Sequence, residues 1–89
     1  MLRIITERRG NAYRLELHGT LTGEGLDVLE QHWFSILAEA PSAIVTVGLS
    51  NVAFINPHGE QLLGRMAERG VEFDVAGCMN RYVIERISG

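Results

Sequence analysis

Apolar and polar side chains alternate along residues 12–18, which is typical of a β-strand with one solvent-facing side. A similar strand is predicted over residues 2–9. Gly10-Asn11 between the two segments is a two-residue turn of the kind that tolerates a positive φ angle. This part of the sequence therefore predicts a β-hairpin.

The spacing of apolar side chains changes to that of a helix over residues 23–40. They recur every three or four positions and form a single stripe, whose members are Leu26, Leu29, Trp33, Ile36, Leu37 and Ala40. Either Thr22 or Gly23 caps the start of this helix, and Pro41 stops it. We therefore expect an amphipathic helix with one buried face.

Residues 43–49 are apolar almost without alternation, which is typical of a central strand covered on both faces. A short apolar segment, residues 52–55, follows this strand. Asn56 and Pro57 then begin a second helix, because asparagine is a favoured N-cap and proline is favoured at the first helical position. Gly70 ends this helix.

Alternation returns over residues 71–76, which predicts a fourth strand, and a short final helix is expected over residues 79–87. The element order is then strand–strand–helix–strand–helix–strand–helix. Because helical crossovers connect parallel strands, this order predicts an α/β fold with a mixed four-stranded sheet and three helices. We expect a two-layer sandwich in a single domain, residues 1–89.

The overall charge narrows the possible partners and compartments. The chain has 89 residues and a formal charge of −3, from 11 acidic residues and 8 arginines without any lysine. A nucleic-acid-binding protein usually carries a basic surplus on one face, so nucleic acid is not an expected partner. No apolar run reaches the roughly 18 residues of a membrane span, and the first residues lack a signal-peptide core. We therefore expect a cytoplasmic protein without membrane insertion.

Residue types that carry catalysis or bind metals do not form a recognisable motif in this sequence. His18, His32 and His58 are not at metal-ligand spacing from one another or from a cysteine. The sequence also lacks a nucleophile elbow, a Walker loop and a dinucleotide-binding glycine motif. These absences predict a protein that is not an enzyme and that needs no metal or cofactor.

The single cysteine, Cys78, excludes an intramolecular disulfide and a multi-cysteine zinc site. It lies at the expected start of the last helix, where thiols are often reactive. The alternative, which the sequence favours, is a small and partly buried side chain beside the end of a strand.

The stretch AFINPHGE, residues 53–60, joins the third strand to the second helix. Helix capping alone explains Asn56 and Pro57, and His58 is expected to project from the exposed first turn. Gly59 is not explained in this way, since glycine costs roughly 1 kcal/mol relative to alanine inside a helix. A glycine here indicates that either a partner or a neighbouring element comes close to the helix backbone.

The segment around this stretch resembles a known family. Residues 44–63 read IVTVGLSNVAFINPHGEQLL, which is similar to the pattern V-x-L-D-L-S-x-V-x-F-I-D-S-S/T-G-L of STAS domains, the fold of bacterial anti-sigma factor antagonists. LELHGTLT, residues 15–22, resembles the family's L-x-L-x-G-E-L-D. Together with the element order, the resemblance covers about residues 2–88 and implies the STAS fold.

The chain departs from the family pattern where the family's switch operates. In the antagonists, a kinase that is also the anti-sigma factor phosphorylates a serine that falls on Pro57, which has no hydroxyl. The next hydroxyl of the family falls on His58, and the family's acidic positions fall on Thr22, Gly48 and Asn56. A phosphate switch adds about two negative charges at the helix start. The resemblance therefore implies a divergent stand-alone member that serine phosphorylation does not switch.

The resemblance implies a non-enzymatic regulatory module of bacterial signalling or transcription regulation. Its protein partner, an anti-sigma factor of the kinase type, would dock on the surface formed by Asn56, Pro57, His58, Gly59 and Glu60. An alternative is an accessory subunit of an ABC-type lipid transporter, in which the same surface contacts the transporter ATPase. A third hypothesis is nucleotide or lipid sensing, which ranks last because residues 15–64 contain no lysine or arginine to pair with phosphate.

A homodimer is also compatible with the predicted fold. Small sandwich domains with one open sheet face often dimerise. Phe34, beside the apolar stripe of the first helix, is an expected exposed contact.

Overall fold

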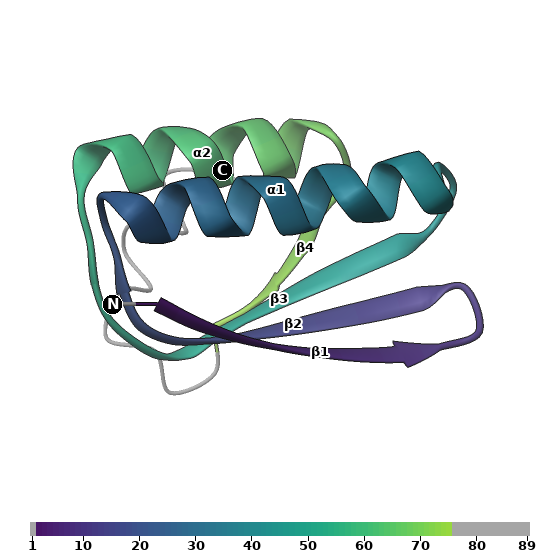
Figure 1. Ribbon diagram of the computed structural model, residues 1–89, viewed down its shortest axis with the longest axis horizontal. Coiled ribbons are helices and arrows are strands. Elements are labelled where there is room, and N and C mark those ends of the chain that lie inside the picture. Colours follow the sequence, from purple (N-terminus) through teal and green to yellow (C-terminus); the bar gives the residue numbers. More distant parts are fainter. Residues whose placement is uncertain (1, 76–89) are drawn as a thin grey trace.

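The computed structural model of the chain describes residues 2–75, and Figure 1 shows their arrangement. The elements in chain order are β1 (Leu2–Arg9), β2 (Ala12–Leu21), α1 (Glu24–Glu39), β3 (Ile44–Ile55), α2 (Pro57–Glu68) and β4 (Glu72–Asp74). The four strands form one sheet in the order β1-β2-β3-β4. β1 runs antiparallel to β2, whereas β3 and β4 each run parallel to the preceding strand in the sheet.

Both helices lie side by side on the same face of the sheet, so the described residues form two layers (Figure 1). The predicted α/β fold with a mixed four-stranded sheet is therefore confirmed. The final helix predicted over residues 79–87 and Cys78 lie outside the described residues. None of the helices within residues 2–75 is long and apolar enough to cross a membrane.

The hairpin forms as predicted, with Gly10 at a φ of 58° and Arg9 paired with Ala12 across the turn. In β2 the buried side chains alternate with half-buried polar ones, which places Tyr13 and Leu15 under the helices. β2 extends beyond the predicted residues 12–18 to Leu21, because its last residues pair with the end of β3. Pairing between segments so far apart in the sequence leaves no local signal.

α1 also follows its prediction. Its start is capped by Gly23, whose φ of 53° favours glycine, and no side chain contributes to this cap. The apolar stripe faces the sheet, with Leu29, Trp33 and Ile36 buried. At the other end, the Ala40 N–H donates to the Ile36 carbonyl at 2.8 Å, just before Pro41.

β3 is one continuous strand rather than the two apolar segments that were predicted. Its pairing with β2 contains two irregularities, and between Glu16 and His18 it advances three residues, from Gly48 to Asn51, while β2 advances two. Such extra residues are β-bulges, which interrupt the alternation of side chains. The prediction of a break near residue 50 is therefore wrong.

The outer face of β3 is only partly covered. Val45 and Val47 are buried under the helices, but Ile44 is 56% exposed on the opposite face. The expectation that both faces of this strand are covered is therefore wrong at its first residue. The alternation is hidden because the outward Ile44 is as apolar as the inward Val45 and Val47, and Gly48 has no side chain.

α2 ends as predicted, with Arg69 as C-cap and Gly70 at a φ of 88°. β4 is shorter than the predicted residues 71–76, and pairs with β3 through Phe73 opposite Val47. The core lies between the sheet and the helices, and its fully buried side chains include Leu15, Leu17, Leu21, Leu29, Val47, Leu49, Leu63 and Met66.

Candidate docking surface

Asn56 fixes the start of α2. Its backbone is extended, with φ −83° and ψ 173°, and its side-chain oxygen accepts a hydrogen bond from the Gly59 N–H at 2.7 Å. The Glu60 N–H donates to the Asn56 carbonyl at 3.0 Å, which begins the helical hydrogen-bond pattern. Pro57 occupies the first turn, where a missing N–H costs nothing. The predicted N-cap is confirmed.

Gly59 is explained by a neighbouring element rather than by a partner. A Cβ atom at this position would lie 2.8 Å from the Leu21 carbonyl oxygen and 2.9 Å from Cγ2 of Ile55. Real Cβ atoms essentially never approach other atoms this closely, so only glycine fits without a shift of the backbone. Gly59 is buried, and it sets the position of α2 rather than offering a contact surface of its own.

The other four residues proposed for docking lie around this buried glycine. Pro57 and His58 are exposed, whereas Asn56 and Glu60 are half-buried. The Asn56 side chain is already occupied by its capping hydrogen bond. His58 is therefore the side chain at this helix start that is best placed to contact a partner.

His58 lies on the wall of a groove between α1 and α2. The groove has a volume of about 510 Å³, and the half-buried Leu26 lies at its apolar base above the buried Leu62. Its polar residues are Asp27, Glu30, His58, Gln61, Arg65 and Glu68. Three acidic side chains thus face one arginine, and this arginine is paired with Glu30 at 2.9 Å. The groove therefore carries an acidic surplus.

Farther along the same seam between the helices is an aromatic hollow of about 230 Å³, which Trp33, Phe34, Arg65, Glu68 and Arg69 line. Phe34 is 50% exposed, as expected, and its ring stacks on Trp33 with a centroid distance of 5.5 Å and an interplanar angle of 25°. The Trp33 indole nitrogen is buried without a hydrogen-bond partner among the described residues. Arg65 and Glu68 line both the groove and the aromatic hollow. The two therefore form one continuous surface, which we call the helix seam.

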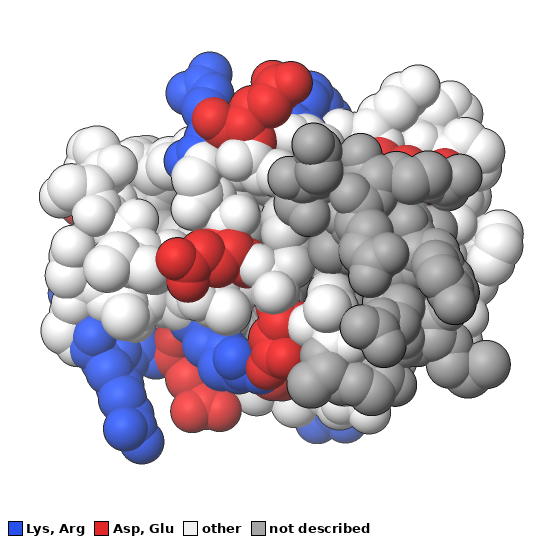
Figure 2. Space-filling model, turned by 180° about the vertical axis from the view of Figure 1, so that it is seen from behind, with Lys and Arg blue, Asp and Glu red and all other residues white. Residues whose placement is uncertain are grey.

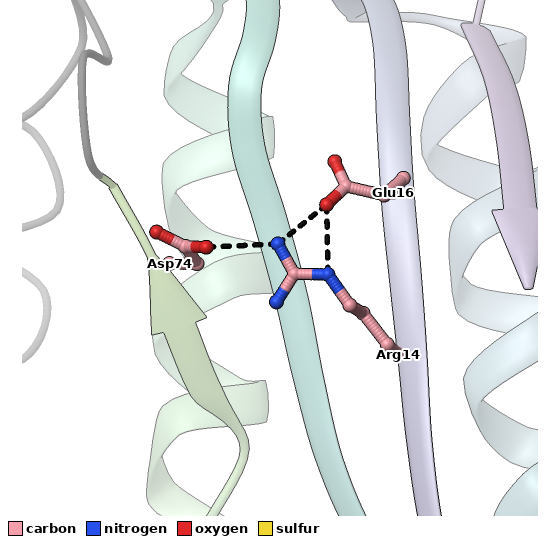
Figure 3. A network of polar contacts seen from close by, with 3 residues as sticks. All are labelled: Arg14, Glu16 and Asp74. Carbon is pink, nitrogen blue, oxygen red and sulfur yellow. Dashed lines mark hydrogen bonds and ion pairs between the residues drawn. The ribbon is translucent and has the colours of Figure 1, made fainter. Parts of the chain in front are cut away.

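The sequence did not predict the polar network on the opposite face of the sheet, which Figure 3 shows. The Arg14 guanidinium crosses β3 and joins Glu16 of β2 to Asp74 of β4, with distances of 2.8 Å from Nε to Glu16 Oε1 and 2.8 Å from an η nitrogen to Asp74 Oδ2. The hydrogen bond to Asp74, followed by the one to Glu16, raises the pKa of Arg14, so it stays charged at every ordinary pH.

Gly48 makes room for this network. It is paired with Glu16 on one side and with Asp74 on the other, so the three residues form one row across the sheet. A Cβ atom on Gly48 would lie 2.6 Å from both carboxylate oxygens of Glu16. The Glu16 carboxylate therefore covers the position at which the STAS pattern has an aspartate.

The remaining histidines do not assemble into a site. His32 is exposed, with a ring nitrogen 3.1 Å from the Val28 carbonyl oxygen, and His18 is half-buried on β2. No group of three or more His, Cys, Asp or Glu side chains within residues 2–75 could hold a metal ion. Figure 2, seen from the side opposite to Figure 1, shows acidic and basic side chains next to one another rather than a patch of one sign.

Replacing Asn56 with alanine is expected to lower the free energy of unfolding by about 1 kcal/mol, because the Gly59 N–H loses its acceptor. Serine at the same position keeps a capping oxygen, so Asn56→Ser is the control and should stay within about 0.5 kcal/mol of the native chain. Urea denaturation measures both variants. Equal losses for alanine and serine would show that the cap does not carry the effect.

Comparisons with known proteins find a solved structure with a similar fold but identify no family for this chain. No family model matches the chain, and no curated protein matches it. Among solved structures, the chain is similar to one described as "Crystal Structure Analysis of Mglu", with a TM-score of 0.62 and 22% sequence identity over 79% of this chain. The match covers only 18% of that protein, so the chain spans less than a fifth of its length. At this identity the likeness shows the fold alone.

Proposed function

We propose that this chain is a non-enzymatic protein-interaction module of the STAS type, which binds its partner along the helix seam. The STAS-like pattern of residues 44–63 supports the family, and the proline at position 57 supports binding without a serine phosphate switch. The observation that carries the proposal is the acidic groove between α1 and α2, which starts at His58. Protein interfaces commonly combine an apolar centre with a polar rim whose charges are complementary to those of the partner.

The chemistry of the helix seam determines which partner it would bind. Asp27 and Glu68 are exposed on the groove wall, and Leu26 and Leu62 lie between the two helices. A partner segment with arginine or lysine side chains around a few apolar ones would match both features. Phe34 at the aromatic end offers an exposed ring on which an arginine could stack. An anti-sigma factor or a transporter ATPase would have to present such a segment.

A role in binding rather than catalysis is supported by the side chains on both faces of the sheet. On the helix side, the groove holds carboxylates and one histidine without a neighbouring nucleophile among the described residues. On the opposite side, Arg14 is held by two carboxylates and keeps its charge, so it does not exchange protons in the pH range of enzymes.

Charge reversal in the groove tests this proposal. The native partner is first isolated on the purified chain and identified, and its affinity for variants is then measured by calorimetry. We expect the double variant Asp27→Lys with Glu68→Lys to bind the partner about tenfold more weakly than the native chain at low salt. Adding His58→Ala to this double variant should weaken binding further. Because exposed charges are screened over about 10 Å at 0.1 M salt, the effect of charge reversal should shrink as salt is added.

The control is Glu39→Lys, which exchanges one acidic side chain for lysine on α1 but outside the groove lining. Its affinity should equal that of the native chain. Equal affinities for the groove variant and the control would place the binding site elsewhere and remove the support for the helix seam. Both groove positions are exposed, so we expect the lysine variants to fold. Circular dichroism verifies that they do.

A further inference from the structure

Within the described residues 2–75, β1 is an outer strand of the sheet and pairs with β2 alone, which leaves its other edge, the free edge, unpaired among these residues. All eight of its residues pair with β2, without a register shift. Natural outer strands are commonly protected from further pairing by proline, by bulges, by shortness or by charged side chains, and β1 has only the last of these, in Arg3, Glu7, Arg8 and Arg9. Six of its eight residues are exposed, among them Ile5, which is 40% exposed. This edge therefore admits a strand whose charges complement those of β1.

The two-residue turn determines which backbone groups of β1 face the free edge. In such a hairpin the residues that flank the turn form a hydrogen-bonded pair, and bonded pairs then alternate with non-bonded ones. Since Arg9 and Ala12 flank the turn, residues 3, 5, 7 and 9 bond to β2. Ile4 and Thr6 then direct their N–H and C=O groups to the free edge, where a new strand would bond to them.

We propose that β1 pairs with β1 of a second copy of this chain, antiparallel about a twofold axis at Ile5. The two four-stranded sheets then become one continuous eight-stranded sheet, with all helices on the same face. In this register Arg3 lies opposite Glu7 of the second copy, and by symmetry Glu7 lies opposite its Arg3. The two Ile5 side chains meet at the axis in a non-hydrogen-bonded pair, in which side chains are closest.

The charges of β1 select this register over its neighbours. A shift of two residues in one direction places Arg3 opposite Ile5, and a shift in the other direction places Arg3 opposite Arg9 and Glu7 opposite Ile5. Neither shift retains an opposite-charge pair on this face. Two Arg3–Glu7 pairs around a central apolar contact therefore make the edge complementary to itself.

The helix side of the edge has room for the second copy. One hollow of about 440 Å³ lies between β1 and the start of α1, lined by Leu2 and by Val28, which is 41% exposed. A second hollow, of about 360 Å³, follows along the same edge and is lined by Thr6 and His32. In the paired sheet, α1 of the second copy would lie against these two hollows. The helix seam lies on the other side of α1, so a partner there is not displaced.

Charge exchange between two variants tests the proposal. Sedimentation of the native chain over a range of concentrations should give a dimer. Arg3→Glu and Glu7→Arg each create two like-charge pairs and should weaken dimerisation about tenfold or more. An equal mixture of these two variants should regain a dimer, because the glutamate introduced at position 3 of one copy then faces the arginine introduced at position 7 of the other. Arg9→Glu, which has no charged residue opposite it in this register, is the control and should behave as the native chain.

The outcomes divide clearly. A native chain that stays monomeric at every concentration would overturn the proposal. A dimer that neither single variant weakens would also overturn it, since the dimer would then use another surface. Recovery of the dimer in the mixture supports the Ile5 register and simultaneously shows that both variants are folded.

Discussion

Gly59→Ala is expected to lower the free energy of unfolding by about 2 kcal/mol, although alanine is the better helix former. Helix propensity alone would raise stability by roughly 1 kcal/mol. The added methyl group, however, would lie 2.8 Å from the Leu21 carbonyl oxygen, which is backbone of the sheet and cannot rotate away. Overpacking against a fixed group costs about 3 kcal/mol at the upper end of its range, so the steric cost exceeds the gain.

The control for this variant is Gln61→Ala, in the same helix but exposed. It should change stability by less than about 0.5 kcal/mol. Thermal denaturation should show a midpoint about 10 °C lower for Gly59→Ala and almost unchanged for Gln61→Ala. If Gly59→Ala is as stable as the native chain, the start of α2 does not lie against the end of β2 as described.

The Gly59 contact also links the fold to the candidate docking surface. The Asn56 N–H donates to the Leu21 carbonyl at 3.4 Å, and the same carbonyl lies against Gly59. The end of β2 therefore sets where α2 begins. That position places His58 on the wall of the groove beside α1. The close contact at Gly59 thus fixes the position of His58 in the groove.

Local signals in the sequence were sufficient to predict much of this fold. The two-residue turn, the apolar stripe of α1 and the Asn56 cap each depend on residues within a few positions of one another. Such features follow from backbone geometry and from the 3.6-residue period of the helix. The close approach at Gly59 was also indicated, but only the structure identifies the end of β2 as the neighbour.

Features that join distant residues could not be predicted in the same way. Arg14 and Asp74 are 60 residues apart, and their contact depends on the register of three strands. The register shifts between β2 and β3 lie beyond this network, and although Gly48 and Gly19 border them, these glycines do not show in the sequence which residues of the two strands pair. The groove likewise depends on how α1 and α2 lie on the sheet.

Gly48→Asp, which introduces the acidic residue of the STAS pattern, is expected to lower the free energy of unfolding by about 2 kcal/mol. The new Cβ atom would lie 2.6 Å from the carboxylate oxygens of Glu16, so the Glu16 side chain must swing away and leave Arg14. The variant also places a third carboxylate beside Glu16 and Asp74 in one row of the sheet. Steric displacement and like-charge repulsion therefore act in the same direction.

The same geometry predicts that a second substitution, Glu16→Ala, restores part of the stability that Gly48→Asp loses. Glu16→Ala alone should cost only about 0.5 kcal/mol, since it removes an ion pair that is partly exposed. When it is combined with Gly48→Asp, the space above β3 is empty and the new carboxylate can approach Arg14 in place of Glu16. We expect the double variant to recover more than half of the stability lost in Gly48→Asp, which corresponds to a coupling of about 1.5–2 kcal/mol between the two positions.

Urea denaturation of the native chain, both single variants and the double variant gives this coupling directly. Additive losses would mean that the Glu16 carboxylate does not occupy the space over Gly48, and the described network would then be wrong. A favourable coupling would show that a carboxylate at position 16 or at position 48, but not at both, fits over β3. Glu16, from the neighbouring strand, places its carboxylate over the same position and holds Arg14 there.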